Sequence, residues 1–436
     1  MVPEKLSSDN ETACRSLWAE FEEIKNLNES ARKKRVRRLI ESVRIFIAEQ
    51  KKTDPNFSFE SCPWLVQFFP VAVEIQPKMG KLNAVNPGIS GVSGMLGTSK
   101  NEINDRLDES LRPRNLFFKI VPETRENLDE IFEKKYGEKI QFPVIFKPAV
   151  GERASFFECL QENEIDDFLK KNAGEKNMIF EEFADTRSEF GLSWSRDPET
   201  EKISIDSLVE KKLPTILGDG TQKISKLVDE KIAELGLSPE KSEKIRNWNR
   251  HHADEILPAG ETRVISRAAS ISFGTKFQKI SVSADDPALV AAVEKMIKNP
   301  DGIFAGRFDL RSENLEELKN GNFKIIEMNG IGGMPLEIYE PERTISEKYE
   351  ILFAHFQKLI RIGEKNLAAG RGEEISFLKS VLEVRRHFFG GEKKQELPDG
   401  VWRDFAEVLK ISHRGRIAAC WLGAKCRALV KKVLKK

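Results

Sequence analysis

The chain has 436 residues, which suggests about two to four domains, and 39% of its residues are hydrophobic, enough for a sizeable core. Its 71 lysines and arginines nearly balance 70 acidic residues, and a net charge of +1 argues against a general nucleic-acid-binding protein, whose binding domain would be strongly basic. The cysteines are scattered, with no CxxC spacing, which argues against a disulfide framework or a zinc ribbon and favours a reducing cytoplasm: they are Cys14, Cys62, Cys159, Cys420 and Cys426.

The N-terminal region, residues 1–60, is rich in charge and predicts a helix. Within Ala31–Gln50 the apolar residues form one stripe and basic residues cover the rest, which indicates an amphipathic packing helix. The first residues lack a basic segment followed by an apolar run, so no signal peptide is expected. The most apolar stretch, Trp64–Ile75, is shorter than the about 20 residues that span a bilayer. A cytoplasmic protein is therefore predicted.

Residues 61–125 read as loops and short elements, punctuated by Asn86-Pro87-Gly88 and by further glycines up to Gly97. The glycine-rich stretch 88–97 is compatible with a substrate loop and equally with a plain connector.

From about residue 126 the pattern becomes mixed α and β, and the predicted fold class is α/β (α+β). Helices are predicted at 128–136, 163–171, 224–235, 287–298 and 345–362. Strands are predicted at 142–146, 178–183, 203–209, 303–310 and 323–328. Residues 240–262 read as a polar insertion, and 311–319 as helical.

The strongest chemical signal lies on the last two predicted strands. Because side chains alternate along a strand, Glu327 and Asn329 share one face, which also carries Ile325. Arg307 and Asp309 share a face of the other strand. If the two strands pair antiparallel, two carboxylates and an amide oxygen converge, and such hard oxygen donors suit Mg²⁺. Taken alone, the same residues also fit polar strand ends that face solvent.

Two weaker signals precede it. Lys147 ends a buried strand and is followed by the small-residue turn Gly151–Ser155, an arrangement that can hold polyphosphate. The strand that ends in Glu182-Phe183, with Glu189 after it, can offer backbone groups to adenine and a carboxylate to ribose. Alone, these features are also compatible with ordinary charged surface.

The tail from residue 369 is basic, with no acidic residue from Ile411 to the end. It is compatible with a helix on an anionic membrane surface, and equally with a solvated or docked terminal helix.

In order along the chain, these signals resemble the ATP-grasp superfamily, which includes D-alanine–D-alanine ligase, glutathione synthetase and cyanophycin synthetase. Gly306-Arg307-Phe308-Asp309 and Glu327-Met328-Asn329 resemble the G-R-x-D and E-x-N elements of that family, and Gly218-Asp219-Gly220 is similar to an element of the cyanophycin type. A bacterial group of carboxylate–amine ligases looks closer still, through Asn86–Ile89, Ser99-Lys100 and Gly274–Phe277.

The resemblance implies an ATP-grasp fold, in which two α+β subdomains grip ATP. The expected regions are a helical N-terminal region (1–60), a substrate region (61–125), the ATP-grasp domain (126–368) and a basic helical tail (369–436).

The resemblance also implies a role for each site residue. Nucleotide-binding roles fall to Lys147 and the Gly151–Ser155 turn at the phosphates, Glu182 and Phe183 at adenine, Glu189 at ribose, and Lys119 and Lys211 as further phosphate contacts. Asp309, Glu327 and Asn329 would bind Mg²⁺. Arg307 would stabilise the transferring phosphoryl group and the tetrahedral intermediate. One departure is that Ala154 and Phe156 stand where the family commonly has glycine.

The implied function is an ATP- and Mg²⁺-dependent ligase that joins a carboxylate to an amine, such as an amino acid or peptide, through an acyl phosphate. Two alternatives stay open: an ATP-grasp kinase, and an ATP-binding regulatory protein with impaired catalysis. A homodimer is expected from the relatives, and no nucleic-acid partner is expected.

Overall fold

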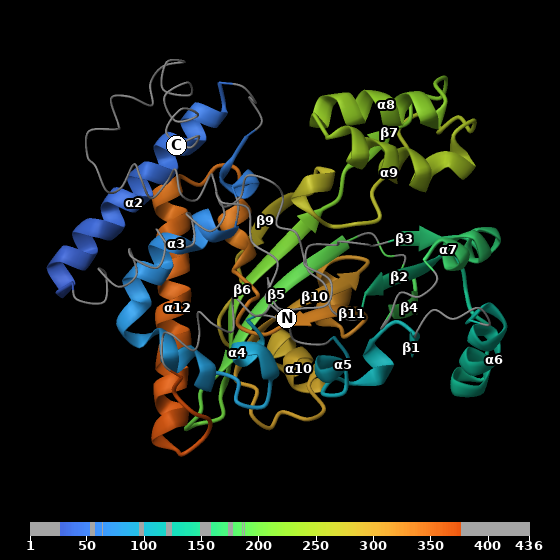
Figure 1. Cartoon of the computed structure of the whole chain (residues 1–436). Coiled ribbons are helices and arrows are strands. Elements are labelled where there is room, and N and C mark those ends of the chain that lie inside the picture. The colour runs from blue at the N-terminus through green and yellow to red at the C-terminus, as the bar shows by residue number, and fades with distance from the viewer. Residues whose placement is uncertain are drawn as a thin grey trace, which may run out of the picture. The chain divides into compact units, whose positions relative to one another are not determined.

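The computed structural model describes residues 27–52, 57–62, 64–95, 100–118, 124–148, 158–172, 178–184, 186 and 188–375 (Figure 1). The predictions for Lys119, for the turn from Gly151 to Ser155 and for the tail beyond residue 375 lie outside this set. The chain divides into two compact units, one formed by the segments up to Ala84 and from Pro341 onward, and the other by Val85–Glu340. The mixed α and β class predicted from the sequence is confirmed.

The first unit is helical. Its long helices are α2 (Glu29–Gln50), α3 (Trp64–Ile75) and α12 (Ile345–Ala368); the 3-10 helix η1 (Phe59–Ser61) lies between α2 and α3, and η2 (Gln76–Ala84) follows α3. The prediction of short elements in this stretch was wrong for α3, which stays helical despite Pro70. The reason is tertiary: α3 packs against α2 and α12, and burial of an almost wholly apolar segment outweighs a local proline. No helix in the described ranges is long and apolar enough to cross a membrane.

The second unit is built on two antiparallel sheets. The larger sheet has the strand order β11 (Lys324–Asn329), β10 (Ala305–Ser312), β5 (Ser188–Arg196), β6 (Ile203–Lys212) and β9 (Lys276–Ile280). One face packs on α10 (Pro287–Met296), and Trp194 stacks on Phe308 within that core, with ring centroids 6.0 Å apart. The predicted strands β6, β10 and β11 are confirmed, whereas β5 and β9 were not predicted.

The smaller sheet has the order β1 (Asn115–Phe118), β4 (Met178–Glu182), β2 (Val144–Pro148) and β3 (Glu158–Leu160). Helices α6 (Thr124–Tyr136) and α7 (Ile165–Lys171) share its apolar core, in which Phe132, Phe146 and Phe180 are fully buried. The predicted helices and strands of this region are confirmed to within a few residues.

A further group of elements lies between β6 and β9 in sequence: β7 (Thr215–Leu217), α8 (Ile224–Leu235), α9 (Pro239–Asn249) and β8 (Thr262–Val264). Gly236 ends α8 in the left-handed conformation, with φ 61°, as its sequence position predicts. The polar segment 240–262 contains most of α9, a helix that was not predicted. Ser238 caps α9, and Ile245 anchors it in a small core of its own.

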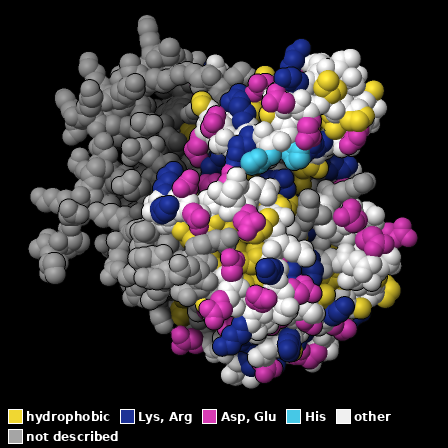
Figure 2. Space-filling view, turned by 90° about the vertical axis from the view of Figure 1, so that its right-hand side faces the viewer, with side chains coloured by type: hydrophobic (Ala, Val, Ile, Leu, Met, Phe, Trp, Pro, Cys, Tyr) yellow, Lys and Arg dark blue, Asp and Glu magenta, His cyan; other side chains and the backbone are white. Residues whose placement is uncertain are grey.

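The segment after Ala84 leads to the larger sheet. Asn86 is fully buried; its Oδ1 accepts hydrogen bonds from the backbone of Phe304 and Ala305 at 2.7 and 3.0 Å. This anchor precedes α4 (Ser90–Gly94) and α5 (Lys100–Asn104), and α5 contacts β11. On the face drawn in Figure 2, basic and acidic side chains are interspersed among the coloured residues, in keeping with the balanced charge of the chain.

Candidate functional site

The pairing of β10 with β11 brings the predicted metal-binding residues together. The strands are antiparallel, with Asp309 opposite Glu327 and Arg307 opposite Asn329. Directly opposed residues of an antiparallel pair lie on the same face of the sheet. The arrangement on which the sequence prediction depended is therefore observed.

A β-bulge lies next to this pair and corrects one detail. The register shifts between Asp309 and Leu310, so that Leu310 pairs with Ile325 and Ile326 is left over. Simple alternation placed Ile325 on the face of Glu327, but Ile325 is buried in the core beside Met328. The bulge therefore confines the polar character of β11 to its end.

Asp309 is held by two cations of the chain. Arg307 donates from Nε to Oδ1 and from a terminal nitrogen to Oδ2, both at 3.1 Å, and the Nζ of Lys211 lies 3.0 Å from Oδ1. Burial alone would raise the pKa of Asp309, but Arg307 and Lys211 outweigh it and hold that pKa below its ordinary value. Asp309 is therefore ionised at neutral pH.

A row of buried charges continues from Asp309 across the sheet. Lys211 of β6 lies opposite Glu189 of β5 and bridges Glu189 and Asp309, with its Nζ 2.9 Å from Glu189 Oε1. The Nε of Arg311 lies 3.1 Å from the other oxygen of Glu189. Burial lowers the pKa of Lys211, but the nearby carboxylates of Asp309 and Glu189 raise it by more. The net effect is a raised pKa, so the ammonium group stays charged.

Glu327 contacts a residue from outside the sheet. The Nζ of Lys100 in α5 lies 2.7 Å from Glu327 Oε1. Burial raises the pKa of Glu327 and so does Asp309, but Lys100 and Lys147 outweigh them and the pKa is lowered. Lys100 was not predicted as a site residue; its only signal was the resemblance of Ser99-Lys100 to a ligase group.

Lys147, predicted at the phosphates, is placed by β2 of the smaller sheet. Its Nζ lies 2.5 Å from Oε1 of Glu181 on the neighbouring strand β4. The positive charge of Lys147 also helps to lower the pKa of Glu327. Charges from both sheets therefore act on Glu327.

The segment after Asn329 packs tightly on the site. A Cβ added to Gly333 would lie 2.9 Å from the Cβ of Asn329 and 3.0 Å from that of Arg307, so only glycine fits without a shift. Arg307 also donates to the carbonyl of Met334 at 2.9 Å. These contacts fix the guanidinium of Arg307 against the site.

The donor set can hold a magnesium ion. Among the residues that the structure describes, no group of three or more His, Cys, Asp or Glu could hold a metal ion. The candidate set is smaller: the carboxylates of Asp309 and Glu327 and the amide oxygen of Asn329, which pairing of β10 with β11 places near one another. Two carboxylates and an amide fit Mg²⁺, which usually keeps waters and phosphate oxygens as further ligands.

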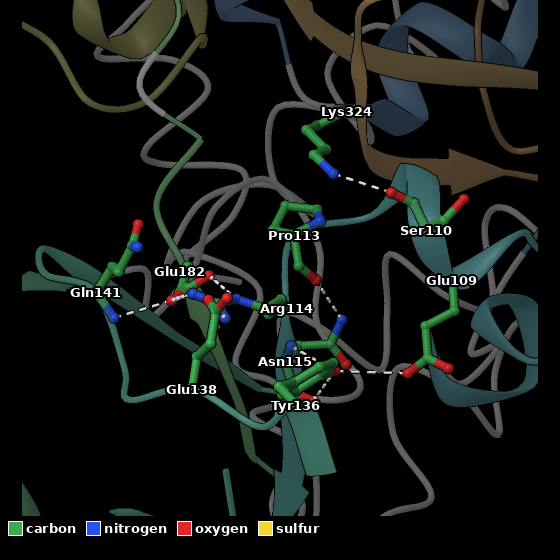
Figure 3. Close-up of polar contacts among 10 residues, drawn as sticks. All are labelled: Glu109, Ser110, Pro113, Arg114, Asn115, Tyr136, Glu138, Gln141, Glu182 and Lys324. Carbon is green, nitrogen blue, oxygen red and sulfur yellow. Dashed lines mark hydrogen bonds and ion pairs between the residues drawn. The ribbon is translucent and has the colours of Figure 1, made fainter. Parts of the chain in front are cut away.

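The predicted adenine residues lie at a charged groove. Arg114 donates to both oxygens of Glu182 at 2.7 Å, and the backbone N–H of Gln141 donates to Glu182 at 2.8 Å (Figure 3). These residues line a groove of about 510 Å³ together with Lys324 of β11. The side chain of Glu182 therefore belongs to this groove.

Phe183 is also engaged within the chain. Its backbone N–H donates to the carbonyl of Pro143 at 3.1 Å. The guanidinium groups of Arg267 and Arg311 lie 4.9 and 4.7 Å from its ring centroid. The placing of Glu182 and Phe183 at adenine stays a prediction, as do the binding roles of the other site residues.

No protein-family model matches the sequence, and no curated protein matches it. Among solved structures, the chain is similar to a D-alanine–D-alanine ligase from Bacillus anthracis, with 13% identity and a TM-score of 0.32, over 64% of this chain and 69% of that chain. A bifunctional glutathione synthetase from Pasteurella multocida gives 14% identity and 0.31, over 63% and 39%. The ATP-grasp ligase PsnB, complexed with a minimal precursor, gives 13% and 0.28, over 61% of each chain. Similarities of this size support no conclusion about this chain by themselves.

Proposed function

We propose that the chain is an ATP-grasp ligase that uses ATP and Mg²⁺ to join a carboxylate to an amine. The observation that carries the proposal is the register of β10 and β11, which sets Asp309 opposite Glu327 and Asn329 beside them. Asp309 is buried, the side chain of Glu327 is 35% exposed, and three basic side chains contact the two carboxylates. Binding of a metal–polyphosphate complex would account for this concentration of charge.

Each residue of the site would contact a different part of the nucleotide or its metal ion. Lys147 and Lys211 would face the phosphates from the two sheets, and Glu189 would accept hydrogen bonds from the ribose hydroxyls. Asp309, Glu327 and Asn329 would hold Mg²⁺, which neutralises phosphate charge when bound. Arg307 would stabilise the charge that develops on the transferring phosphoryl group.

The reaction needs no nucleophilic side chain. An oxygen of the substrate carboxylate attacks the γ-phosphorus of ATP, the bond to the β-phosphate oxygen breaks, and ADP leaves. The amine nitrogen then attacks the acyl carbon, inorganic phosphate leaves, and the nitrogen loses a proton to complete the amide. The protein acts by positioning its substrates and by neutralising charge. An amino acid or a peptide is the substrate class that we propose.

The test is ADP release in mixtures of amino acids and peptides, with products identified by mass spectrometry. The wild type should release ADP and phosphate and form an amide, whereas Asp309→Asn and Glu327→Gln should lose at least about a hundredfold in rate. Asp229→Asn is a matched control, since Asp229 pairs only with the exposed Arg246 in the described structure. A phosphorylated product without an amide would instead indicate a kinase. Nucleotide binding with no turnover in any mixture would refute the ligase and leave a regulatory protein.

A further inference from the structure

The charges of the candidate site pair with one another to an unusual degree. In the structure each basic residue of the site contacts a carboxylate at 2.5–3.1 Å, and each carboxylate contacts a basic residue. The basic set is Lys100, Lys147, Lys211, Arg307 and Arg311, and the acidic set is Glu181, Glu189, Asp309 and Glu327. Five cations against four anions leave the site with a net charge of about one.

The metal-binding carboxylates are part of this closed set. Both oxygens of Asp309 accept hydrogen bonds from Arg307, and one also contacts Lys211. Oε1 of Glu327 is taken by Lys100. A divalent cation that approaches Asp309 and Glu327 therefore meets carboxylate oxygens that are already paired with basic side chains of the chain.

The balance of charge opposes a metal ion alone. A divalent cation would add two positive charges to a site that already has an excess of one, in a partly buried setting where like charges repel strongly. The phosphates of ADP or ATP would reverse that balance, because they offer the basic residues a stronger partner than a single carboxylate. Metal and phosphate together leave the site close to neutral.

Lys100 differs from the other basic residues of the set. It comes from α5, whereas the others belong to β2, β6 and β10. Its side chain is 20% exposed, against 15% for Lys147 and 5% for Lys211, and it contacts the carboxylate of Glu327. Lys100 therefore has the position of a replaceable counter-ion at the metal-binding carboxylate.

We propose that Lys100 holds Glu327 in place of the metal and that a divalent cation enters only together with a nucleotide, whose phosphates draw the basic residues away from the carboxylates. The inference rests on the proposed function and adds a rule of binding order to it. Lys100 acts here as a positioning residue, since its contact is with Glu327.

Equilibrium dialysis of Mn²⁺ against the full chain tests this rule. Free ADP and free Mn²⁺ reach the same concentration on both sides of the membrane, so an excess of Mn²⁺ on the protein side measures the metal bound to the protein. We expect the wild type to bind Mn²⁺ at least about tenfold more tightly with ADP than without it. Lys100→Met should bind Mn²⁺ alone at least about tenfold more tightly than the wild type, and Lys100→Arg should match the wild type. Lys226→Met is the control: Lys226 lies on α8, is exposed, and lies 3.9 Å from Glu230, away from every residue assigned to the site.

The outcomes separate the inference from the function beneath it. Wild-type binding of Mn²⁺ that is equally tight with and without ADP would overturn the binding order and leave the ligase proposal intact. Lys100→Met that equals Lys226→Met would overturn the role of Lys100, once thermal unfolding has shown that both variants are folded. If the wild type binds neither ADP nor Mn²⁺ when both are present, both the inference and the proposed function are overturned.

Discussion

Glu189→Gln tests the buried charge row most sharply, because glutamine keeps the shape of the side chain and removes only the charge. Glu189, Lys211, Asp309 and Arg311 are each only 5–6% exposed, so water screens them little. The variant would leave Lys211 and Arg307 sharing the carboxylate of Asp309, and would leave Arg311 without its carboxylate partner. Loss of one partner from a buried ion pair costs about 3–5 kcal/mol. Lys211 keeps its contact of 3.0 Å with Asp309, so we expect the lower end, about 3 kcal/mol.

Urea unfolding measures this loss as a lower midpoint at unchanged slope. Glu230→Gln on α8 is the control, since its carboxylate is exposed and lies 3.9 Å from Lys226; it should change stability by less than about 0.5 kcal/mol. Adding Lys211→Met to Glu189→Gln should restore part of the stability, because it removes the unbalanced cation. A Glu189→Gln variant as stable as the control, or a double variant that loses the full sum, would refute the argument from buried charge.

Three further predictions concern the site and its surroundings. Gly333→Ala should displace Asn329 and Arg307 and so weaken the binding of ADP with Mg²⁺ at least about tenfold, as measured by calorimetry. Gly321→Ala is the control, since its added Cβ meets nothing within 4 Å; it should bind ADP normally and lose only about 1 kcal/mol of stability. The pKa of Asp309 is lower in the folded protein than its ordinary value of 3.8. The ionised carboxylate therefore stabilises the fold above pH 3.8, and this contribution is lost as the pH falls through the pKa of the folded state. Asp309→Asn should make the stability depend less on pH in this acidic range. Arg114→Met should cost about 1–3 kcal/mol in urea unfolding by leaving Glu182 of the groove without its two hydrogen bonds at 2.7 Å.

Local pattern was enough to predict that Asp309 and Glu327 lie together on one face of the sheet. Alternation along a strand gave the faces of Arg307 and Asp309, and a short connection made β10 and β11 natural antiparallel neighbours. The β-bulge was not predictable, because it leaves no mark in the alternation of Ile325 and Ile326.

Partners that are distant in sequence were beyond such reasoning. Lys100 and Glu327 are 227 residues apart, and tertiary contacts, among them those of the buried Asn86 with the start of β10, hold this segment against the sheet. Likewise, Lys147 stood out at the end of a strand, whereas its partner Glu181 looked like ordinary surface until β2 and β4 paired.

Among the elements that were missed are β5 and α3. In β5, Phe190, Leu192 and Trp194 alternate with small residues and enter one core, so the strand pattern is present in the sequence and was overlooked beside Gly191. A Cβ on Gly191 would lie 2.2 Å from a methyl carbon of Leu336, so glycine is needed there for packing. α3 remains helical through Pro70 for the tertiary reason given above.

The central claim is that Asp309 and Glu327 form a metal-dependent nucleotide site. Calorimetric titration of ATP and ADP into the full chain, with and without Mg²⁺, tests it most directly when the wild type is compared with the Asp309→Asn/Glu327→Gln double variant. Our account predicts that Mg²⁺ tightens nucleotide binding to the wild type and that the double variant loses this dependence while it remains folded. Nucleotide binding that is equally tight in both proteins, or no binding to the wild type, would contradict it.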